Sequence, residues 1–501
     1  MQFLQTTYRT ILAFIFLMLA ASSCTDEVIG ELEPTTPPSP VGTSAFITLN
    51  ITAPVQTRAN TPVGGEGGDD SLEDDTNEDL IENVIVFFYK ASEGETFDHA
   101  ANAGAPIQAV AYFSELTRST SDENNFSTET KEVKLKDGTY RMLVVANSYL
   151  FDELPQTGDA LSKLRDYTHR NLPWTHNNGS YSRFTMSSKD ESTVTLTAKE
   201  STKDSPSLIN GIELQRLAAR IDFKPTATNK YEIKDKDGKV TFDITVEGIR
   251  IINRMVSGTY LLKRTATDIL NGTCTTLGKE TADAENRATN YVVDPWSAGK
   301  KVENYDGKDY KSMYEDRAED PHTWTDADNI QTSDDYYRLG YVLENTTDKD
   351  SQLCGYSTGV MIKAVGIPRK YINDDGQVKE NNSVRNFCTY NNKVYKDRKA
   401  LKAVTGIEEK DFDAKGVKEY IGGVMYYPYF IRHCYNGGTS NAIMEFAIVR
   451  NNVYQLHINS FSSPGNPDGT VDPETPSKET MVVIGASIRP WNERDKEEII
   501  M

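Results

Sequence analysis

AFITLNITAPV, residues 45–55, alternates apolar and polar side chains along its length. In an extended chain such alternation places one set of side chains on each face, which is the pattern of a half-buried β-strand. The apolar face predicted for this strand consists of Ile47, Leu49, Ile51, Ala53 and Val55. Thr48, Asn50 and Thr52 point the other way, so we expect the opposite face to lie toward water.

One basic residue, Arg58, follows this strand within PVQTRANTP, residues 54–62. The next stretch, VGGEGGDDSLEDDTNED (63–79), is rich in glycine and carboxylates and predicts an exposed acidic loop. An arginine between a completed strand and an exposed loop is accessible to a protease. A cut between Arg58 and Ala59 would separate the whole strand from the rest of the fold.

The N-terminus has the pattern of an export signal. Arg9 supplies the positive charge, TILAFIFLMLAA the apolar core and ASSC the small residues of a cleavage site. The apolar run is short for a membrane span. The cysteine resembles that of a bacterial lipobox, so we predict a signal peptide over 1–23 and a lipid on Cys24. Residues 24–58 are then a propeptide that contains the tether PTTPPSPVG and the first strand.

The composition favours an all-β protein and argues against nucleic-acid binding. The chain of 501 residues has a formal net charge of −20, whereas nucleic-acid binding needs a basic surface. Short strand-like runs separated by turn residues predict two tandem β-sandwich domains, 59–213 and 214–501, with long loops and a few short helices. We predict one helix within 159–172, and hairpins at Asp137-Gly138 and Asp237-Gly238.

Motifs that would indicate an enzyme are missing from the sequence. It has no G-x-S-x-G, H-E-x-x-H, P-loop or G-x-G-x-x-G pattern, and its six histidines are not spaced as metal ligands. We therefore predict no catalytic residues, no metal site and no cofactor. The remaining cysteines, Cys274, Cys354, Cys388 and Cys434, form no CxxC pair, and their spacing does not distinguish disulfides from buried thiols.

The C-terminal third resembles the end of the Bacteroidales fimbrillins. VMYYPYFIRH is followed by RNNVYQLHINSF, a spacer rich in Pro, Asp, Thr and Glu, and then ETMVVIGASIRPWN. The positions that carry the resemblance are Arg450, Asn451, Asn452, Tyr454, Pro490 and Trp491. The N-terminal half is similar more loosely, in GTYRMLVVAN, FTMSSK and LQRLAARIDF. The chain is most similar to the major shaft subunit of the Mfa-type minor fimbria, although its spacer is shorter.

The resemblance implies a pilin of a type V pilus, built of two transthyretin-like or Greek-key sandwiches. In that family an outer-membrane lipoprotein precursor is cut by an arginine-specific protease and loses its first strand. A C-terminal strand of a neighbouring subunit, another copy or an accessory pilin, then fills the groove. The candidate donor face here is Val482, Ile484, Ala486 and Ile488. Trp491 is either an interface anchor or part of ordinary strand-end packing. Mature subunits would stand in cell-surface fimbriae whose adhesion ligand is unknown.

Other functions stay open from the sequence. The chain resembles a shaft subunit more than a tip or anchor subunit, because neither an extra adhesive domain nor resistance to cleavage is evident. A surface glycan-binding lipoprotein is a second interpretation, which would need clustered exposed aromatic residues. The four tryptophans, Trp174, Trp296, Trp324 and Trp491, are widely separated in the sequence. An exported hydrolase is a third, but it lacks any recognisable nucleophile or carboxylate pair.

Overall fold

The fold is all-β, as predicted, with few and short helices. The structure is a computed structural model, and all of its described residues fall within the compact unit Gly42–Met501. They are residues 44–53, 78–90, 104–121, 124–148, 153–169, 174–177, 180–189, 191–197, 199–255, 258–262, 314–315, 331–333, 336–346, 352–433, 445–472, 481–490 and 499–500. Within these ranges no helix is long and apolar enough to cross a membrane.

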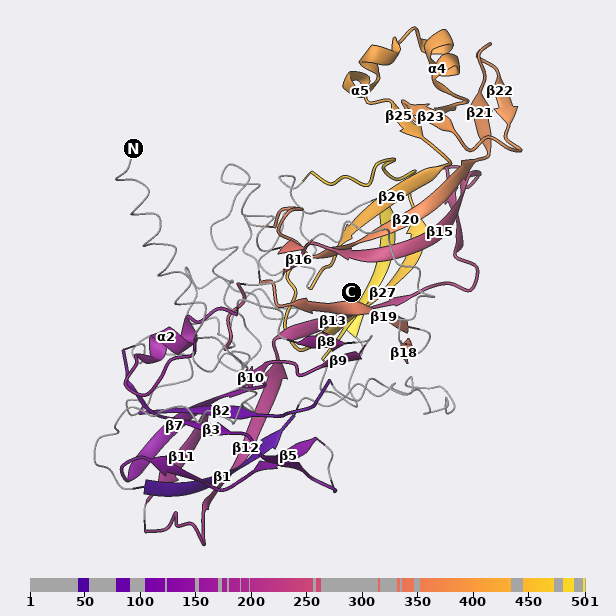
Figure 1. The fold of residues 1–501 in the computed structure, drawn as a ribbon. Coiled ribbons are helices and arrows are strands. Elements are labelled where there is room, and N and C mark those ends of the chain that lie inside the picture. The colour runs from indigo at the N-terminus through magenta and orange to yellow at the C-terminus, as the bar shows by residue number, and fades with distance from the viewer. Residues whose placement is uncertain are drawn as a thin grey trace, which may run out of the picture. The chain divides into compact units, whose positions relative to one another are not determined.

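A 10-stranded sheet forms the first sandwich (Figure 1). Its main order is β3 (Ile107–Phe113), β2 (Val84–Tyr89), β7 (Gly138–Ala146), β10 (Met186–Ser188), β12 (Ser207–Arg216), β1 (Ser44–Thr52), β5 (Asn125–Thr128) and β4 (Leu116–Arg118). β11 (Ser192–Leu196) pairs with β7, and β6 (Lys131–Lys134) pairs with β1. Apolar side chains of β1 and β12 share one core cluster with those of β2, β3 and β7, so the sheet forms two layers around a core.

The second sandwich is built from two further sheets. The 6-stranded sheet has the order β18 (Gln331–Ser333), β19 (Tyr336–Leu343), β13 (Ala218–Lys224), β27 (Asn452–Phe461), β28 (Val482–Pro490) and β29 (Ile499–Ile500). The 4-stranded sheet has the order β14 (Lys230–Lys234), β15 (Val240–Ile252), β20 (Gly359–Pro368) and β26 (Val424–Phe430). One cluster of buried side chains, including Ile221, Ile362 and Tyr454, fills the space between these sheets.

A small subdomain is inserted between β20 and β26 (Figure 1). Its 5-stranded sheet has the order β22 (Val378–Glu380), β21 (Lys370–Ile372), β24 (Lys393–Tyr395), β23 (Phe387–Tyr390) and β25 (Lys418–Tyr420). Its helical elements are α4 (Arg398–Thr405), η7 (Glu409–Asp411) and α5 (Phe412–Lys415). The Asp397 side chain caps α4 by accepting from the Ala400 amide at 2.9 Å, and Gly406 ends the helix in the left-handed conformation.

The remaining elements are small. They are α2 (Leu161–Arg165), the pair β8 (Thr175–Asn177) and β9 (Ser180–Ser182), and the pair β16 (Arg254–Met255) and β17 (Tyr314–Glu315). The position of α2 confirms the helix predicted within 159–172, although the helix is shorter. Cys388 is a buried free thiol, and burial raises its pKa to about 12. Cys354 is buried, while Cys274 and Cys434 lie outside the described residues.

The two predicted hairpins had different outcomes. β14 and β15 pair antiparallel around Gly238, whose φ of 79° suits a turn glycine, so that prediction is confirmed. The hairpin at Asp137-Gly138 is wrong, because β6 pairs with β1 whereas β7 pairs with β2 and β11. The turn carries the chain from one layer to the other instead of reversing it within a layer. A turn dipeptide specifies local backbone direction only, and pairing is decided by where each apolar face is buried.

The chain leaves the first sandwich between β12 and β13. β12 ends at Arg216 in the 10-stranded sheet, and β13 begins at Ala218 in the 6-stranded sheet. Leu217, between them, is fully buried. The domain boundary between residues 213 and 214 stays a prediction. The passage of the chain from one sheet to the other, at Leu217, lies close to it.

Candidate assembly site

The first strand, β1, lies inside its sheet and not at an edge. On one side it pairs in parallel with β12, with Ile47 opposite Ser207 and Thr52 opposite Glu213. On the other side it pairs antiparallel with β6 over Ser44–Ile47 and with β5 over Asn50–Thr52. Removal of β1 would therefore leave unpaired backbone groups on both neighbouring strands.

The apolar face predicted for this strand is buried throughout its described part. Ala45, Ile47, Leu49, Ile51 and Ala53 have exposed fractions of 0–2%. They pack in the core cluster that contains Phe88, Phe113 and Met142 from the facing layer. Burial of each large aliphatic side chain is worth about 1.5–3 kcal/mol, so the strand is held mainly by Ile47, Leu49 and Ile51.

The polar face of β1 makes hydrogen bonds to both neighbours. Asn50 Nδ2 donates to Asn210 Oδ1 at 2.7 Å, and Asn50 Oδ1 accepts from Ser127 Oγ at 2.8 Å. Thr52 Oγ1 donates to Asn125 Oδ1 at 2.8 Å. These groups are partly exposed, so water can replace the contacts at small net cost. The apolar face, not the polar face, sets the requirement for any strand that occupies this position.

Several predicted site residues fall outside the described residues. They are Cys24, Val55, Arg58, Ala59 and Trp491. The described chain stops at Ala53 and resumes at Glu78. Their assigned roles therefore stay predictions.

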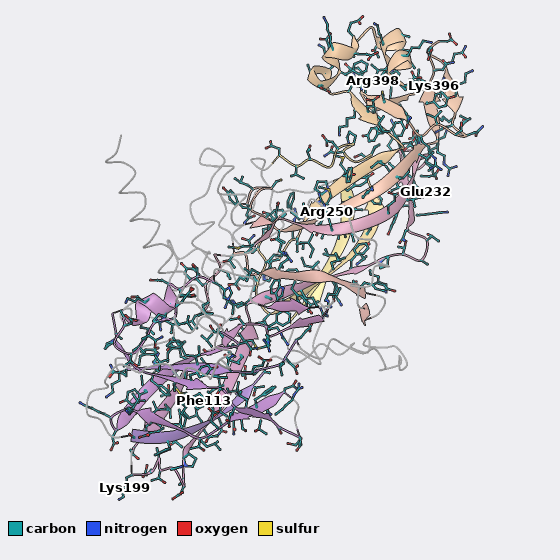
Figure 2. The ribbon with its side chains drawn as sticks, in the orientation of Figure 1. Phe113, Lys199, Glu232, Arg250, Lys396 and Arg398 are labelled. Atoms are coloured by element: carbon teal, nitrogen blue, oxygen red, sulfur yellow. The ribbon has the colours of Figure 1, made fainter. Side chains whose placement is uncertain are left out.

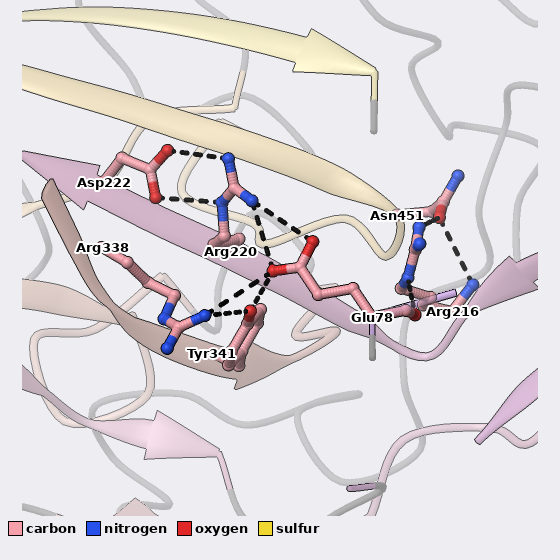
Figure 3. Close-up of polar contacts among 7 residues, drawn as sticks. All are labelled: Glu78, Arg216, Arg220, Asp222, Arg338, Tyr341 and Asn451. Carbon is pink, nitrogen blue, oxygen red and sulfur yellow. Dashed lines mark hydrogen bonds and ion pairs between the residues drawn. The ribbon is translucent and has the colours of Figure 1, made fainter. Parts of the chain in front are cut away.

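The end of the acidic stretch 63–79 is not exposed, which corrects the expectation for Glu78 and Asp79. Their exposed fractions are 2% and 0%. Figure 3 shows Glu78 among arginines from different sheets. Its carboxylate accepts from Arg220 Nη1 at 3.2 and 3.3 Å, and also accepts from the Tyr341 hydroxyl. These partners lie on β13 and β19, so Glu78 is bound to the second sandwich.

The same segment is bound to the end of β12. Arg216 Nε donates to the Glu78 carbonyl at 2.8 Å, and Arg216 Nη1 donates to Asn451 Oδ1 at 3.3 Å (Figure 3). Arg220 also pairs with Asp222, and the Arg338 guanidinium lies 3.9 Å from Glu78. We call Glu78, Arg216, Arg220, Asp222, Arg338, Tyr341 and Asn451 the Glu78 network. It ties the end of the acidic stretch 63–79 to both sandwiches.

Electrostatics keep Glu78 ionised. Burial alone would raise the pKa of this carboxyl, but the charges of Arg220 and Arg216 and the hydrogen bond from Tyr341 outweigh it. The net pKa lies below the ordinary value for glutamate. The interaction is therefore fully present above the ordinary glutamate pKa and is lost as the pH falls through the lower, folded-state value.

Asn147 secures the next few residues. Its backbone has a φ of 55°, and its side-chain Nδ2 donates to the Leu80 carbonyl at 2.7 Å and to the Phe184 carbonyl at 2.9 Å. The Glu82 amide donates to Asn147 Oδ1 at 2.8 Å. The path from Glu78 into β2 is thus fixed by contacts that do not involve β1.

The candidate donor strand, β28, is paired in its own sheet. It runs antiparallel to β27, from Asn452 opposite Pro490 to Phe461 opposite Val482. On its other side β29 pairs only with Ser487 and Ile488, so within the described residues the edge over Val482–Ala486 has no strand beside it. Val482 is buried and Ile484 packs against the same core cluster. Backbone pairing places Ala486 opposite Leu456 and Ile488 opposite Tyr454.

The R-N-N-x-Y motif holds buried polar contacts between elements. Arg450 is 1% exposed and forms an ion pair with Glu344 at 2.9 Å, while its guanidinium also donates to Ser187 Oγ and the Leu261 carbonyl. Asn451 adopts a φ of 58° and is the partner of Arg216 described above. Tyr454 Oη accepts from the Val449 amide and lies 2.8 Å from His433 Nδ1. The motif therefore joins strands and loops from distant parts of the sequence.

His433 offers a test of this packing through pH. Burial lowers its pKa to about 3, so the ring is neutral in the folded protein at neutral pH. Because the folded-state pKa lies below the unfolded one, stability is present above the ordinary histidine pKa and falls as the pH drops toward the folded value. Between about pH 7 and pH 5 this group should remove about 2 kcal/mol from the free energy of unfolding.

We expect the His433→Gln variant to lose that part of the pH dependence. Urea unfolding at the two pH values, compared with the parent chain, measures it. All other titrating groups are common to both proteins. The contribution of His433 is therefore the difference between the two proteins in how the free energy of unfolding changes with pH. An equal response in both proteins would show that His433 titrates normally.

The C-terminal part of the chain matches one known protein family. Residues 418–497, from β25 to beyond β28, match the family model described as "Major fimbrial subunit protein type IV, Fimbrillin, C-terminal". The match confirms the resemblance to the fimbrillins and supports a pilin or adhesion role. No curated protein matches the sequence.

Three fimbrial proteins are among the solved structures that match the chain. A fimbrilin (FimA) from Porphyromonas gingivalis is 15% identical, with 89% of this chain and 99% of that chain covered and a TM-score of 0.40. The tip fimbrial protein Mfa3 from the same organism, C-terminally truncated, is 12% identical (88% and 99% covered, TM-score 0.33). A fimbrial assembly protein from Parabacteroides distasonis is 13% identical (91% and 99% covered, TM-score 0.33).

Proposed function

We propose that this chain is a structural subunit of a type V fimbrium, acting in the shaft. It is exported as an outer-membrane lipoprotein through Cys24 and cut after Arg58 by an arginine-specific protease. It then polymerises by strand exchange, with further copies and accessory pilins, into surface filaments that serve adhesion. It has no enzymatic role and needs no cofactor. The fimbrillin match over 418–497 supports the coarser part of this proposal.

The observation that carries the proposal is the placement of β1. It is paired on both sides and buries the apolar face of its described part, yet the chain from Glu78 onward is held separately by the Glu78 network and by Asn147. Loss of β1 would open a groove with two unpaired edges and an apolar floor. A strand from another chain can fill such a groove by β-augmentation.

The distribution of basic residues favours one cut. Arg58 is the only lysine or arginine between Arg9 and Lys90. A protease that recognises basic residues therefore has a single site in this part of the chain. Cys24 lies upstream of the cut, so cleavage would separate the lipid from the folded protein and open the groove in one step.

The donor in this proposal is β28. It would leave β27 and exchange its contacts within the second sandwich for contacts in the groove of the next subunit. Val482 and Ile484 have the alternation that the β1 groove requires, and within the described residues β29 pairs with only part of the outer edge of β28. Such head-to-tail donation is a heterologous contact, which produces an open filament.

The experiment is cleavage of the purified precursor with an arginine-specific protease. We expect a new N-terminus at Ala59, followed by filaments in electron microscopy and ladders on SDS gels. The matched control is Arg58→Lys, which keeps the charge but is not a substrate, and it should stay monomeric and uncut. Truncation of the cut protein at residue 478 should abolish filaments while leaving the first sandwich folded. Filaments from uncut protein, or none from cut protein, would contradict the proposal.

A further inference from the structure

A cavity of about 860 Å³ lies where the β14–β15 hairpin meets the inserted subdomain and the segment 462–464. Its walls include Lys234–Lys236 of the hairpin, Lys370–Ile372 of β21 and the turn between β23 and β24. Its volume is within the range of about 300–1,000 Å³ that is usual for small-ligand sites. We call it the basic groove, because of the charges described next.

Cations dominate the lining of the basic groove. Among the described residues that line it, seven are lysine or arginine and one, Asp235, is acidic. The chain as a whole has a net charge of −20, so this gathering runs against its general composition. The Asp235 carboxylate is engaged in the hairpin turn, where it accepts from the amides of Asp237 and Lys239 at 3.0 and 2.9 Å. The groove is therefore a positively charged region on an acidic protein.

Part of this charge has no carboxylate partner among the described residues. Three cations are paired: Arg369 with Asp243 at 2.5 Å, Lys370 with Glu380, and Lys234 with Glu232 at 3.4 Å. Within the described residues, Lys236, Lys393 and Lys418 have no carboxylate within ion-pair distance. The half-buried Lys418 is held in place by donating to Asn466 Oδ1 at 2.9 Å. An anion in the groove would supply the missing partner.

The rest of the lining suits a sugar ring. Tyr371 and Tyr390 line the groove and are half-buried, so the exposed part of each ring offers apolar surface beside the cations. The exposed side chains of Asn391 and Asn392 lie at the β23–β24 turn, and both residues have positive φ, 48° and 59°. Ser462 and Ser463 add hydroxyls across the groove. Amides and hydroxyls of this kind exchange hydrogen bonds with the hydroxyls of a saccharide.

We propose that the basic groove binds an acidic oligosaccharide, with sulfate or carboxylate groups on the lysines and a sugar ring against the tyrosines. An acidic oligosaccharide would be the class of adhesion ligand in the proposed function. Only the presentation of the groove on a filament rests on that function. Binding itself needs only the folded subunit. It can therefore be tested on monomeric precursor, so that its failure is separate from a failure to polymerise.

The test is calorimetric titration of the monomeric precursor with a heparin-derived hexasaccharide. We expect saturable binding that weakens as salt is added, because salt screens the exposed lysines. Lys393→Glu and Lys418→Gln should each weaken binding by about tenfold, through the loss or reversal of one close charge contact. The matched control is Lys199→Glu, since Lys199 is exposed and lies outside the groove (Figure 2). It should bind like the parent, and all variants should show the parent melting temperature.

Three further titrations decide the ligand class. A neutral dextran oligosaccharide of equal length should not bind, because it has no anion for the lysines. Inorganic polyphosphate that binds as tightly as the hexasaccharide would show that charge alone is recognised and would overturn the proposal. A peptide of residues 59–77 carries six carboxylates and no basic residue. Tighter binding of this peptide than of the hexasaccharide would also overturn it, because the groove would then be a contact between subunits. An unchanged affinity in both groove variants would overturn it as well.

Discussion

A disulfide that locks β1 into its sheet should abolish filament formation even when the chain is cut after Arg58. The pair of changes is Asn50→Cys with Ser127→Cys. These residues are directly opposite on β1 and β5, and their side chains already meet, since Ser127 Oγ donates to Asn50 Oδ1 at 2.8 Å. Opposite residues of antiparallel strands have Cα atoms about 4.5–5.5 Å apart, which is within the range a disulfide spans.

The physical reason is that the cut breaks the chain but not the strand pairing. With the disulfide in place, β1 keeps its apolar face in the groove after proteolysis, so no donor strand can enter. The oxidised protein should show the new N-terminus at Ala59 and stay monomeric. Reduction should release β1 and restore filaments, which makes the same sample its own reference. Electron microscopy and N-terminal sequencing before and after reduction measure both effects.

The matched control keeps Ser127→Cys but places the second cysteine on β4 instead of β1. Thr117→Cys with Ser127→Cys joins β4 to β5, and Thr117 is opposite Ser127 in that pairing. Both strands lie downstream of the cut, so this disulfide leaves β1 free to go. The control should polymerise whether oxidised or reduced. If the β1–β5 disulfide also permits filaments in the oxidised protein, β1 does not have to leave and the strand-exchange proposal fails.

The sequence predicted best where a strand buries one face. The alternation over 45–55 correctly predicted the buried positions Ile47, Leu49 and Ile51, because period-2 patterning reflects burial directly. It did not show that β1 is paired on both sides, and in parallel with β12. Strand partners 160 residues apart leave no local signal, since pairing depends on the packing of both layers together.

The prediction that Glu78 is exposed was wrong, because a glutamate within an acidic stretch is normally expected to be solvated. The compensating charges are far away, at Arg216, Arg220 and Arg338. A signal was present in those partners. Each arginine interrupts an apolar strand, in LQRLAARIDF and YYRLGYVL, where a solvated charge would not be expected. Buried arginines require carboxylate partners. An acidic residue just before the strand at 84–89 was therefore a candidate for that partner.

The Glu78→Ala change should cost about 3–5 kcal/mol of the free energy of unfolding, because it leaves buried arginines without their carboxylate. Arg220 would keep Asp222, but Arg338 and the Tyr341 hydroxyl would lose the group they face (Figure 3). The network also joins β12 to β13 and β19, so the two sandwiches should unfold in separate steps in the variant. Urea unfolding followed by tryptophan fluorescence and far-UV circular dichroism measures both effects. Trp174, which packs against Phe184 and Tyr341, reports on this region.

The matched control is Glu232→Ala, at a residue labelled in Figure 2. It removes an exposed glutamate that pairs with Lys234 at 3.4 Å. Its cost should be below about 1 kcal/mol, because both partners are well hydrated. Glu78→Gln should fall between the two, since it keeps an acceptor for Tyr341 but not the charge. After cleavage at Arg58, Glu78→Ala should also shed or loosen the new N-terminal segment, seen as added proteolysis beyond residue 78. A loss of stability no larger than that of Glu232→Ala would show that Glu78 does not hold this part of the chain.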